Sequence, residues 1–522
     1  MELKQCVMRK TYAKGKTQTQ MVLGEDYSLT EGKPDIEKLL QKKAEVRVEE
    51  VHTEKGRIRV KGKLHLWVLY LPMHSGETLG TLNTEIPFEE LLHLEEVVHG
   101  DQLKIGWNID ELKVQIVHPG KINIRSVVTL SANIWSEEDV LVTEDVQGSR
   151  DIFTKVTTFE AAACVVNQKE IYHIEEQLEL PANMPNVERL LWSVLQLRNA
   201  QAIPQEGRVA VSGELLFWTV YEGEGTMEEL RWMEKTIAFQ GFLEVPGIKK
   251  AAFGVPKLEL SEQTIQIQPD RDGELRVFHL SAAMELWLHM YEEGSCRCLT
   301  DAYSMQQEIS MATEPIFYEK LRMCDTFKCP VSGQAKLPDT RGISGIVGHY
   351  ANLKKATVRE TDQGLVWEST LEVQVLYQTA DLVTGFAATE LLIPCSQVIE
   401  VAGMQKEDTW NLSPQPEQLF ITYDEDSVKV QGILNLSVCV LEQCKGQNIT
   451  GIQMEEEDLK GRKNRPGMLV HFVQPGETLW DIAKEHRSSM EVLRDENELG
   501  EGEVQVGQKL LLFHEPAEKI FS

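Results

Sequence analysis

The stretch GRIRVKGKLHLWVLY, residues 56–70, decides the fold of this chain because it recurs twice. Residues 207–221 read GRVAVSGELLFWTVY, and a weaker copy, GLVWESTLEVQVLY, occupies residues 364–377. The closing residues Tyr70, Tyr221 and Tyr377 are 151 and 156 residues apart. Charged and apolar residues alternate in the first copy and then give way to an almost wholly apolar end. This pattern, with its β-branched and aromatic content, predicts a half-buried β-strand.

Two further blocks repeat in step with the first. The second block begins 16 residues after each tyrosine, as IPFEELL, IAFQGFL and IPCSQVI at Ile86, Ile237 and Ile393. The third block, INIRSVVTLSANIW, begins at Ile122 and returns at intervals of 153 residues, from Leu275 and from Val428. A period of this size indicates tandem domains, because the repeats of a solenoid are about 20–50 residues long.

One segment in each of the first two copies of the repeat has the pattern of a helix. Residues 34–40 read PDIEKLL, in which a proline suits the first helical turn and the nearby acidic residues complement the helix dipole. Ile36, Leu39 and Leu40 then form one apolar helical face. Pro185 begins the matching segment PNVERLLWSVLQL, whereas the third copy has LPDTRGISGIVGHY and is interpreted as having diverged there.

The expected fold is therefore mainly β with minor α. It comprises three tandem β-rich, sandwich-like domains with about one helix each, and then a small βααβ domain. The expected domains cover residues 1–147, 148–300 and 301–448, with a linker at 449–467 and a final domain at 468–515. The linker is predicted from GIQMEEEDLKGRKNRPG, in which an acidic run precedes a basic run and Pro-Gly. The aromatic residues near the strand ends are expected in the core: Trp67, Tyr70, Trp218 and Tyr221.

The net charge of the chain argues against some classes of binding partner. The 522 residues include 53 Lys and Arg against 82 Asp and Glu, which gives a net charge of −29. Such an excess argues against nucleic-acid binding and against anionic membrane surfaces. No apolar stretch approaches the ~20 residues of a membrane span, and the first residues, MELKQCVMRKTYAKGK, lack the apolar core of a signal peptide. We therefore expect a cytoplasmic protein without an integral membrane segment.

No catalytic residue, cofactor or metal site is predicted. The sequence has no G-x-S-x-G, P-loop, G-x-G-x-x-G or H-E-x-x-H motif. His65, His118, His279 and His289 lie in or beside expected strands and are interpreted as structural. The nine cysteines have no paired CxxC spacing and are interpreted as ordinary thiols. Two carboxylates brought together from distant positions are the one catalytic arrangement that these patterns leave open.

The end of the chain predicts a separate module. A short strand at Val470–Val473 is followed by the turn Pro475-Gly476 and by a helix that Thr478 and Asp481 cap. Ser488 and Glu491 predict a second capped helix that ends at Asn497, and Lys509–Phe513 predicts a closing strand. Leu479, Trp480, Ile482 and Leu493 are expected only to fold the module. So small a core is marginal, which gives the caps and turns added weight.

This segment resembles a LysM domain, through PGETLWDIA, the asparagine after the second helix, and VGQKLLL. The resemblance implies binding of N-acetylglucosamine-containing glycans such as peptidoglycan, in a groove between two loops. The groove residues that it implies are Gly476, Glu477, Thr478, Leu479, Asn497, Glu498 and Leu499. The second loop, ELGEGEVQV, is acidic and lacks the usual proline, so a protein-binding LysM domain stays an alternative.

The whole chain resembles the SipL and SpoVID group of spore-coat assembly proteins, in which SPOCS-type domains precede LysM. The segments PDIEKLL, VKGKLHLWVLY and IPFEELL carry this resemblance. It implies a non-enzymatic scaffold in the mother cell that helps the coat encase the forespore. Its LysM domain would dock onto the basement-layer morphogenetic ATPase, with other coat proteins as further partners. A peptidoglycan-binding protein is the alternative hypothesis, and an enzyme is the least favoured one.

Overall fold

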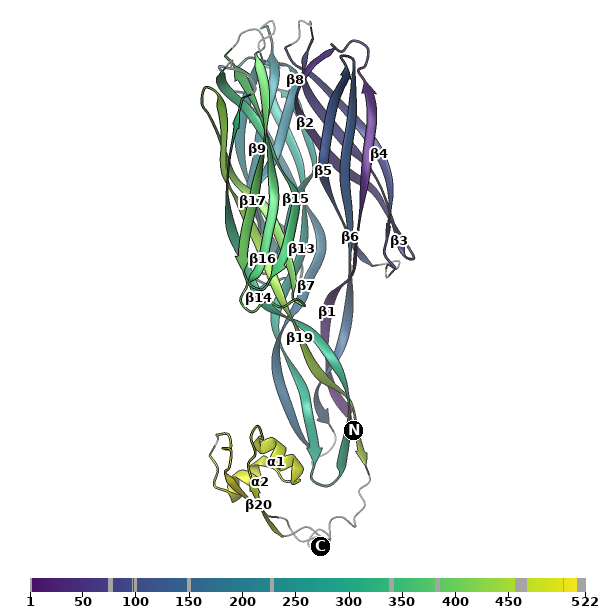
Figure 1. Cartoon of the computed structure of the whole chain (residues 1–522), viewed down its shortest axis with the longest axis vertical. Helices are drawn as coiled ribbons and strands as arrows, with labels where there is room; N and C mark the ends of the chain where they lie inside the picture. The colour runs from purple at the N-terminus through teal and green to yellow at the C-terminus, as the bar shows by residue number, and fades with distance from the viewer. Residues whose placement is uncertain are drawn as a thin grey trace.

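A computed structural model describes residues 2–73, 78–95, 97, 101–147, 152–225, 230–337, 342–380, 385–455, 467–500 and 502–513. Its described part is mainly β, with two short helices confined to the C-terminal module. The molecule is elongated (Figure 1). Sheets form a broad upper body, the ends of long strands form a narrower stalk below it, and the C-terminal module lies beside the lower end of the stalk. The predicted fold class, mainly β with minor α, is confirmed.

The first unit consists of six antiparallel strands in two sheets. These strands are β1 (Glu2–Ser28), β2 (Ile36–Glu54), β3 (Arg57–Pro72), β4 (Gly80–His93), β5 (Gln102–His118) and β6 (Lys121–Gln147). One sheet has the order β1-β6-β5 and the other β2-β3-β4. Buried residues of both sheets, such as Ile58 and Leu64 in β3 and Ile122 and Leu130 in β6, belong to one core cluster. The unit is therefore a two-layer sandwich.

The second and third units repeat this topology. Unit 2 contains β7 (Ile152–Glu179), β8 (Val187–Gln205), β9 (Arg208–Gly223), β10 (Leu230–Glu244), β11 (Phe253–Gly254), β12 (Lys257–Pro269) and β13 (Leu275–Ser304). Unit 3 contains β14 (Glu308–Lys336), β15 (Ile343–Thr361), β16 (Gly364–Thr379), β17 (Phe386–Glu400), β18 (Thr409–Tyr423) and β19 (Ser427–Glu455). One sheet of each unit has three strands, in the order β10-β9-β8 in unit 2 and β15-β16-β17 in unit 3. The opposite sheet is built on β13 in unit 2 and on β19 in unit 3. Each of these units encloses its own apolar core.

The helix predicted in each early copy is wrong. Residues 36–40 begin strand β2 and residues 187–197 lie in strand β8. In β2 the register shifts between Ile36 and Lys38 and again between Leu39 and Gln41. Each such bulge inserts one extra residue and so interrupts the two-residue alternation of a strand. Apolar side chains then recur three or four residues apart, which imitates the period of a helix.

The third unit has not diverged at this point, contrary to the interpretation of its sequence. Strand β15 occupies the place of β2 and β8, and it carries two bulges close together, at Ile343/Gly345 and Ile346/Gly348. Strand β8 carries the matching pair at Val187/Arg189 and Leu190/Trp192. The backbone irregularity is thus common to all three units, although the Pro-led sequence is not.

The prolines before β2 and β8 serve as acceptors instead of helix starts. The Tyr70 hydroxyl donates to the carbonyl oxygen of Pro34 at 3.2 Å, and Tyr221 donates to Pro185 at 3.3 Å. Tyr70, Tyr221 and Trp218 are fully buried, as predicted, while Trp67 is half-buried. Each tyrosine therefore ties the end of its strand to the start of the neighbouring one.

A shared apolar cluster joins the three units. Its buried members come from β2, β3 and Leu79 just before β4, from β8–β10 and from β15–β17, among them Leu69, Leu216, Trp218 and Leu376. The Trp218 indole N–H also donates to the His349 carbonyl oxygen at 2.6 Å, which links units 2 and 3. The units are consequently packed around one centre and are not separate beads on a string.

The long strands β1/β6, β7/β13 and β14/β19 continue beyond the sandwiches and form the stalk (Figure 1). A small apolar cluster of all three units holds them together, with Val142, Cys298 and Ile316 buried. The Asn448 side chain adds two hydrogen bonds to β6, one from the Thr143 N–H and one to the Leu141 carbonyl. All nine cysteines are free thiols.

The predicted domain limits differ in places from the ends of the strands. β13 continues past residue 300 to Ser304, and β19 continues past residue 448 to Glu455. The predicted linker at 449–467 therefore begins within a strand, and its residues 456–466 lie outside the described residues. The C-terminal module consists of β20 (Met468–Phe472), α1 (Leu479–Glu485), α2 (Met490–Glu496) and β21 (Lys509–Phe513), the predicted βααβ order.

Gly348 provides a test of the shared cluster. A Cβ atom at this position would lie 2.3 Å from the Trp218 ring, whereas at Gly345 in the same strand it would meet nothing within 4 Å. We expect Gly348→Ala to lower the free energy of unfolding by about 1–3 kcal/mol through overpacking. The matched variant Gly345→Ala should stay within about 0.5 kcal/mol of the parent protein. Equal unfolding midpoints of the two variants in chemical denaturation would contradict the role of the cluster.

Candidate binding site on the C-terminal module

The first predicted loop of the module forms the turn between β20 and α1. Gly476 has φ +82°, which explains the glycine in this turn. The Glu477 carboxylate accepts hydrogen bonds from the Gln474 N–H at 2.8 Å and from His471 Nε2 at 2.9 Å. Thr478 is the N-cap of α1 and forms the predicted capping box with Asp481. Leu479 is buried in the core of the module. Among the four residues of the predicted first loop, 476–479, Gly476 and Thr478 are exposed.

The second predicted loop follows α2. The Asn497 side chain donates to the carbonyl oxygens of Leu493 and Leu511 and accepts from the Leu511 N–H, so it fastens the helix end to β21. Glu498 is exposed, with φ +48°, and Leu499 packs against the core that also holds Leu479. Both predicted loops thus attach to one core. The second helix is capped by Ser489, one residue later than predicted.

An apolar surface lies on the outer face of the two-stranded sheet. Met468, Val470 and Phe472 alternate along β20 and are 44–55% exposed. The antiparallel register places Met468 opposite Phe513, which is 47% exposed, and Val470 opposite Leu511. We call Met468, Val470, Phe472, Leu511 and Phe513 the outer sheet face. An apolar face of this kind on a small domain is typical of a protein-binding surface.

The opposite side of the module contacts the stalk. The Trp480 indole N–H donates to Asp301 Oδ2 at 2.8 Å, and Lys484 Nζ donates to Asp301 Oδ1 at 2.6 Å. The Trp480 ring meets Tyr303 edge to face, with 4.9 Å between centroids, and the Tyr303 hydroxyl donates to the Ser488 carbonyl. Tyr303 belongs to the module's own core cluster, against which Phe153 also packs. The ends of β7 and β13 therefore extend the core of the module.

Trp480 makes a contact with the stalk that the sequence did not predict. It is buried, as expected for a residue that folds the module, but its partners are Asp301 and Tyr303 of the stalk. One sequence signal was available. Leu479, Ile482 and Ala483 make up the apolar stripe of α1, and a tryptophan immediately outside such a stripe requires a partner from elsewhere in the protein. Ser488, predicted as a cap, instead supplies the carbonyl that accepts from Tyr303.

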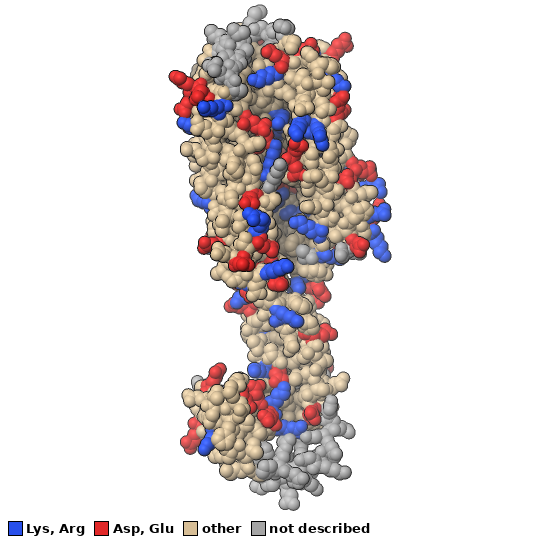
Figure 2. Space-filling view, viewed as in Figure 1, with Lys and Arg blue, Asp and Glu red and all other residues tan. Residues whose placement is uncertain are grey.

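A groove of about 1130 Å³ between units 1 and 2 is a second candidate surface. It is lined by β2, β3 and β5 on one side and by β7, β12 and β13 on the other, with Trp107 and Trp287 among its residues. Carboxylates predominate over basic side chains in its lining, and burial raises the pKa of one of them, Glu45. The exposed surface in Figure 2 carries both charges interspersed. The lining of the groove is thus more acidic than basic.

Two of the histidines interpreted as structural, His65 and His289, pack against aromatic residues. Burial lowers the pKa of His289 to about 4, and its Nε2 is 2.9 Å from the Tyr291 hydroxyl. Burial also lowers the pKa of His65, which stacks on Trp67. His118 is exposed and His279 is half-buried. Within the described ranges, no helix is long and apolar enough to cross a membrane.

Comparisons with known proteins agree with the two resemblances drawn from the sequence. Residues 35–117 match the family described as SipL, SPOCS domain, and residues 471–513 match the LysM domain family. The first match spans β2 to β5, which include one wall of the groove, and the second spans the C-terminal module. No curated protein and no solved structure matches the chain.

These matches cover two parts of the chain. SPOCS and LysM domains are binding or scaffold domains without catalytic activity of their own, and together they match a SipL-like spore-coat protein. The chain fits a sporulation-related protein that binds through its LysM domain, for which the LysM family suggests glycan or peptidoglycan as a ligand.

Asp301 provides a test of the contact between module and stalk. Asp301→Asn removes the negative charge of the carboxylate to which Trp480 and Lys484 donate hydrogen bonds. We expect this change to weaken docking of the module on the stalk by about 1–3 kcal/mol. Hydrogen exchange of the amides in residues 479–488 should then become faster. Asp139→Asn is the matched control, because Asp139 lies on a stalk strand but pairs only with the exposed Arg9 in the described structure. Equal exchange in both variants would contradict the contact.

Proposed function

We propose that this chain is a non-catalytic scaffold of spore-coat assembly. In this proposal it acts in the mother cell at the forespore surface and docks through its LysM module onto a protein of the coat basement layer, the morphogenetic ATPase. The matches to the SPOCS and LysM families support the setting of the proposal. The choice of a protein over a glycan as the ligand of the module rests on the side chains of the module itself.

A protein ligand is favoured because the polar side chains of the predicted glycan groove are already hydrogen-bonded. Three of its polar side chains already make hydrogen bonds inside the module: Glu477 with Gln474 and His471, Thr478 with Asp481, and Asn497 with Leu493 and Leu511. A sugar that used these groups would have to replace bonds that hold the turn, the cap and the end of α2. The loss would offset much of what each new hydrogen bond contributes, about 1 kcal/mol net.

The outer sheet face provides what a protein partner requires. Phe472 is 49% exposed, and Lys509 Nζ lies over its ring, 5.6 Å from the centroid. Phenylalanine is among the aromatic residues enriched at protein interfaces. The few residues that carry most of the binding energy of an interface contribute about 2 kcal/mol or more each. The basic Lys509 at the border of the face also suits an acidic partner segment, since opposite charges direct the approach of the two surfaces.

The decisive experiment compares two exposed phenylalanines. Phe472 lies on the outer sheet face, and Phe420 is 59% exposed on β18 in unit 3. We expect Phe472→Ser to weaken binding of the purified chain to the basement-layer ATPase by about tenfold or more. A fluorescent fusion carrying this change should then leave the forespore surface during sporulation. Phe420→Ser should bind and localise like the parent protein.

Sedimentation with purified peptidoglycan distinguishes the alternative. If the parent chain sediments, Phe472→Ser sediments equally, and removal of residues 468–513 abolishes sedimentation, the module is a glycan-binding LysM domain and the proposal fails. Failure to sediment, together with loss of ATPase binding in Phe472→Ser, supports the protein ligand.

A further inference from the structure

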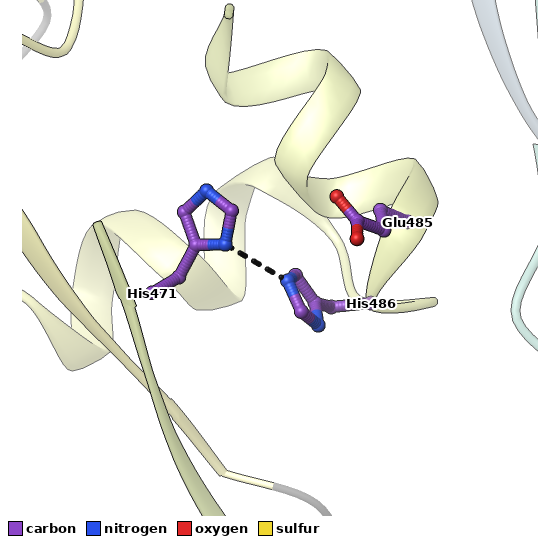
Figure 3. A group of neighbouring side chains, drawn as sticks. All are labelled: His471, Glu485 and His486. Atoms are coloured by element: carbon purple, nitrogen blue, oxygen red, sulfur yellow. Dashed lines mark hydrogen bonds between the residues drawn. The ribbon is translucent and has the colours of Figure 1, made fainter. Parts of the chain in front are cut away.

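Three side chains of the module converge beneath its sheet. His471 comes from β20, and Glu485 and His486 come from the end of α1 (Figure 3). One ligand atom from each, two imidazole nitrogens and a carboxylate oxygen, lies within 4.8 Å of the other two. His471 and His486 are half-buried and Glu485 is exposed. These residues take no part in the proposed docking surface.

The distances between these atoms suit a divalent metal ion. His471 Nδ1 and His486 Nε2 are 3.2 Å apart. Two nitrogens bound to a tetrahedral zinc ion at about 2.0–2.1 Å are separated by roughly 3.3 Å, so the imidazoles already have the spacing of a shared ion. The carboxylate of Glu485 reaches the same point by rotation of an exposed side chain. Two histidines and one carboxylate form a known zinc donor set with a fourth position open to water.

A fourth residue holds His471 in the tautomer that a metal ion needs. The Glu477 carboxylate lies 2.9 Å from His471 Nε2, on the far side of the ring from His486. The same carboxylate oxygen accepts a hydrogen bond from the Gln474 N–H at 2.8 Å, which fixes its place beside the ring. A hydrogen bond donated from Nε2 to this carboxylate leaves Nδ1 as the ring nitrogen that faces His486. Carboxylate–histidine–metal arrangements of this kind orient the ligand in zinc proteins.

We propose that His471, Glu485 and His486 form a binding site for a divalent transition metal of the zinc class, with Glu477 as the residue that positions His471. The ion would connect β20 to the end of α1, two elements that no backbone ladder joins in the described structure. A domain of this size has little core to stabilise it, so an added metal link should raise its resistance to unfolding.

The test is a titration of the untagged full-length chain, freed of metal by a chelator, with Co²⁺. One equivalent should bind and give the visible absorption of tetrahedral cobalt without a thiolate charge-transfer band, since the donors are nitrogen and oxygen. Added Zn²⁺ should abolish this absorption. Zn²⁺ should also slow hydrogen exchange in residues 468–488. Absence of a stoichiometric cobalt signal, or a signal with thiolate character, would overturn the site.

Variants assign the ligands. His486→Gln should weaken Co²⁺ binding about tenfold or more, and Glu477→Gln about 10–100-fold by releasing the orientation of His471. Glu485→Gln, at an exposed position that leaves the fold intact, should weaken it several-fold. His52→Gln in unit 1 is the matched control, because His52 also lies beside a glutamate but is far from the site in the sequence. Unchanged affinity in either His486→Gln or Glu485→Gln would refute the three-ligand site.

Discussion

The architecture depends on strands that are buried on both faces near one end. In β9 and β16 the first residues mostly alternate between buried and partly exposed, and then a run of seven residues is buried without interruption. In β3 the corresponding run is shorter, Val68–Tyr70. In β9, Phe217 and Tyr221 face the core of unit 2, whereas Leu216, Trp218 and Val220 face the shared cluster. Full burial of such a side chain contributes about 1.5–3 kcal/mol. Apolar burial therefore outweighs the few hydrogen bonds between units, each about 1 kcal/mol net. Because the strands fix the units around one centre, the long strand pairs β1/β6, β7/β13 and β14/β19 meet in a single stalk.

Much of this could be predicted from the sequence, because the repeat and the alternation of residues are local signals. The apolar end of each strand was visible in VLY and TVY, but the second buried surface was not, since its other half comes from residues more than 100 positions away. The false helix has an equally physical cause. Two bulges within a few residues of Ile36 and of Val187 create helical spacing in a strand. A pattern of apolar residues indicates which side chains are buried. It does not show whether they share a face because the backbone is helical or because a strand contains a bulge.

In the C-terminal module, too, features set by neighbouring residues could be predicted and contacts between distant residues could not. The cap at Thr478, the turn at Gly476 and the asparagine after α2 were all predicted, since each depends on residues a few positions apart. The contact of Trp480 with Asp301 joins positions 179 apart and has no local pattern. His471 and His486 are likewise brought together only by the fold. The predicted groove residues stay a prediction, and the structure adds that Glu477, Thr478 and Asn497 also hold the module together.

The contact with the stalk is small, and its connection to the chain explains how it can hold. A tryptophan ring, an aspartate with two donors and one tyrosine hydroxyl would form a weak complex between separate proteins. Here the module is covalently joined to β19, so the contact forms at the high effective concentration of an intramolecular reaction. Phe472 and Phe513 of the outer sheet face, and Thr478 and Glu498 of the groove, are exposed while the module is docked. A ligand on either surface consequently does not compete with the stalk. It would be held in a fixed orientation to the long axis of the molecule, which is what distinguishes a module packed on a scaffold from one that hangs from a linker.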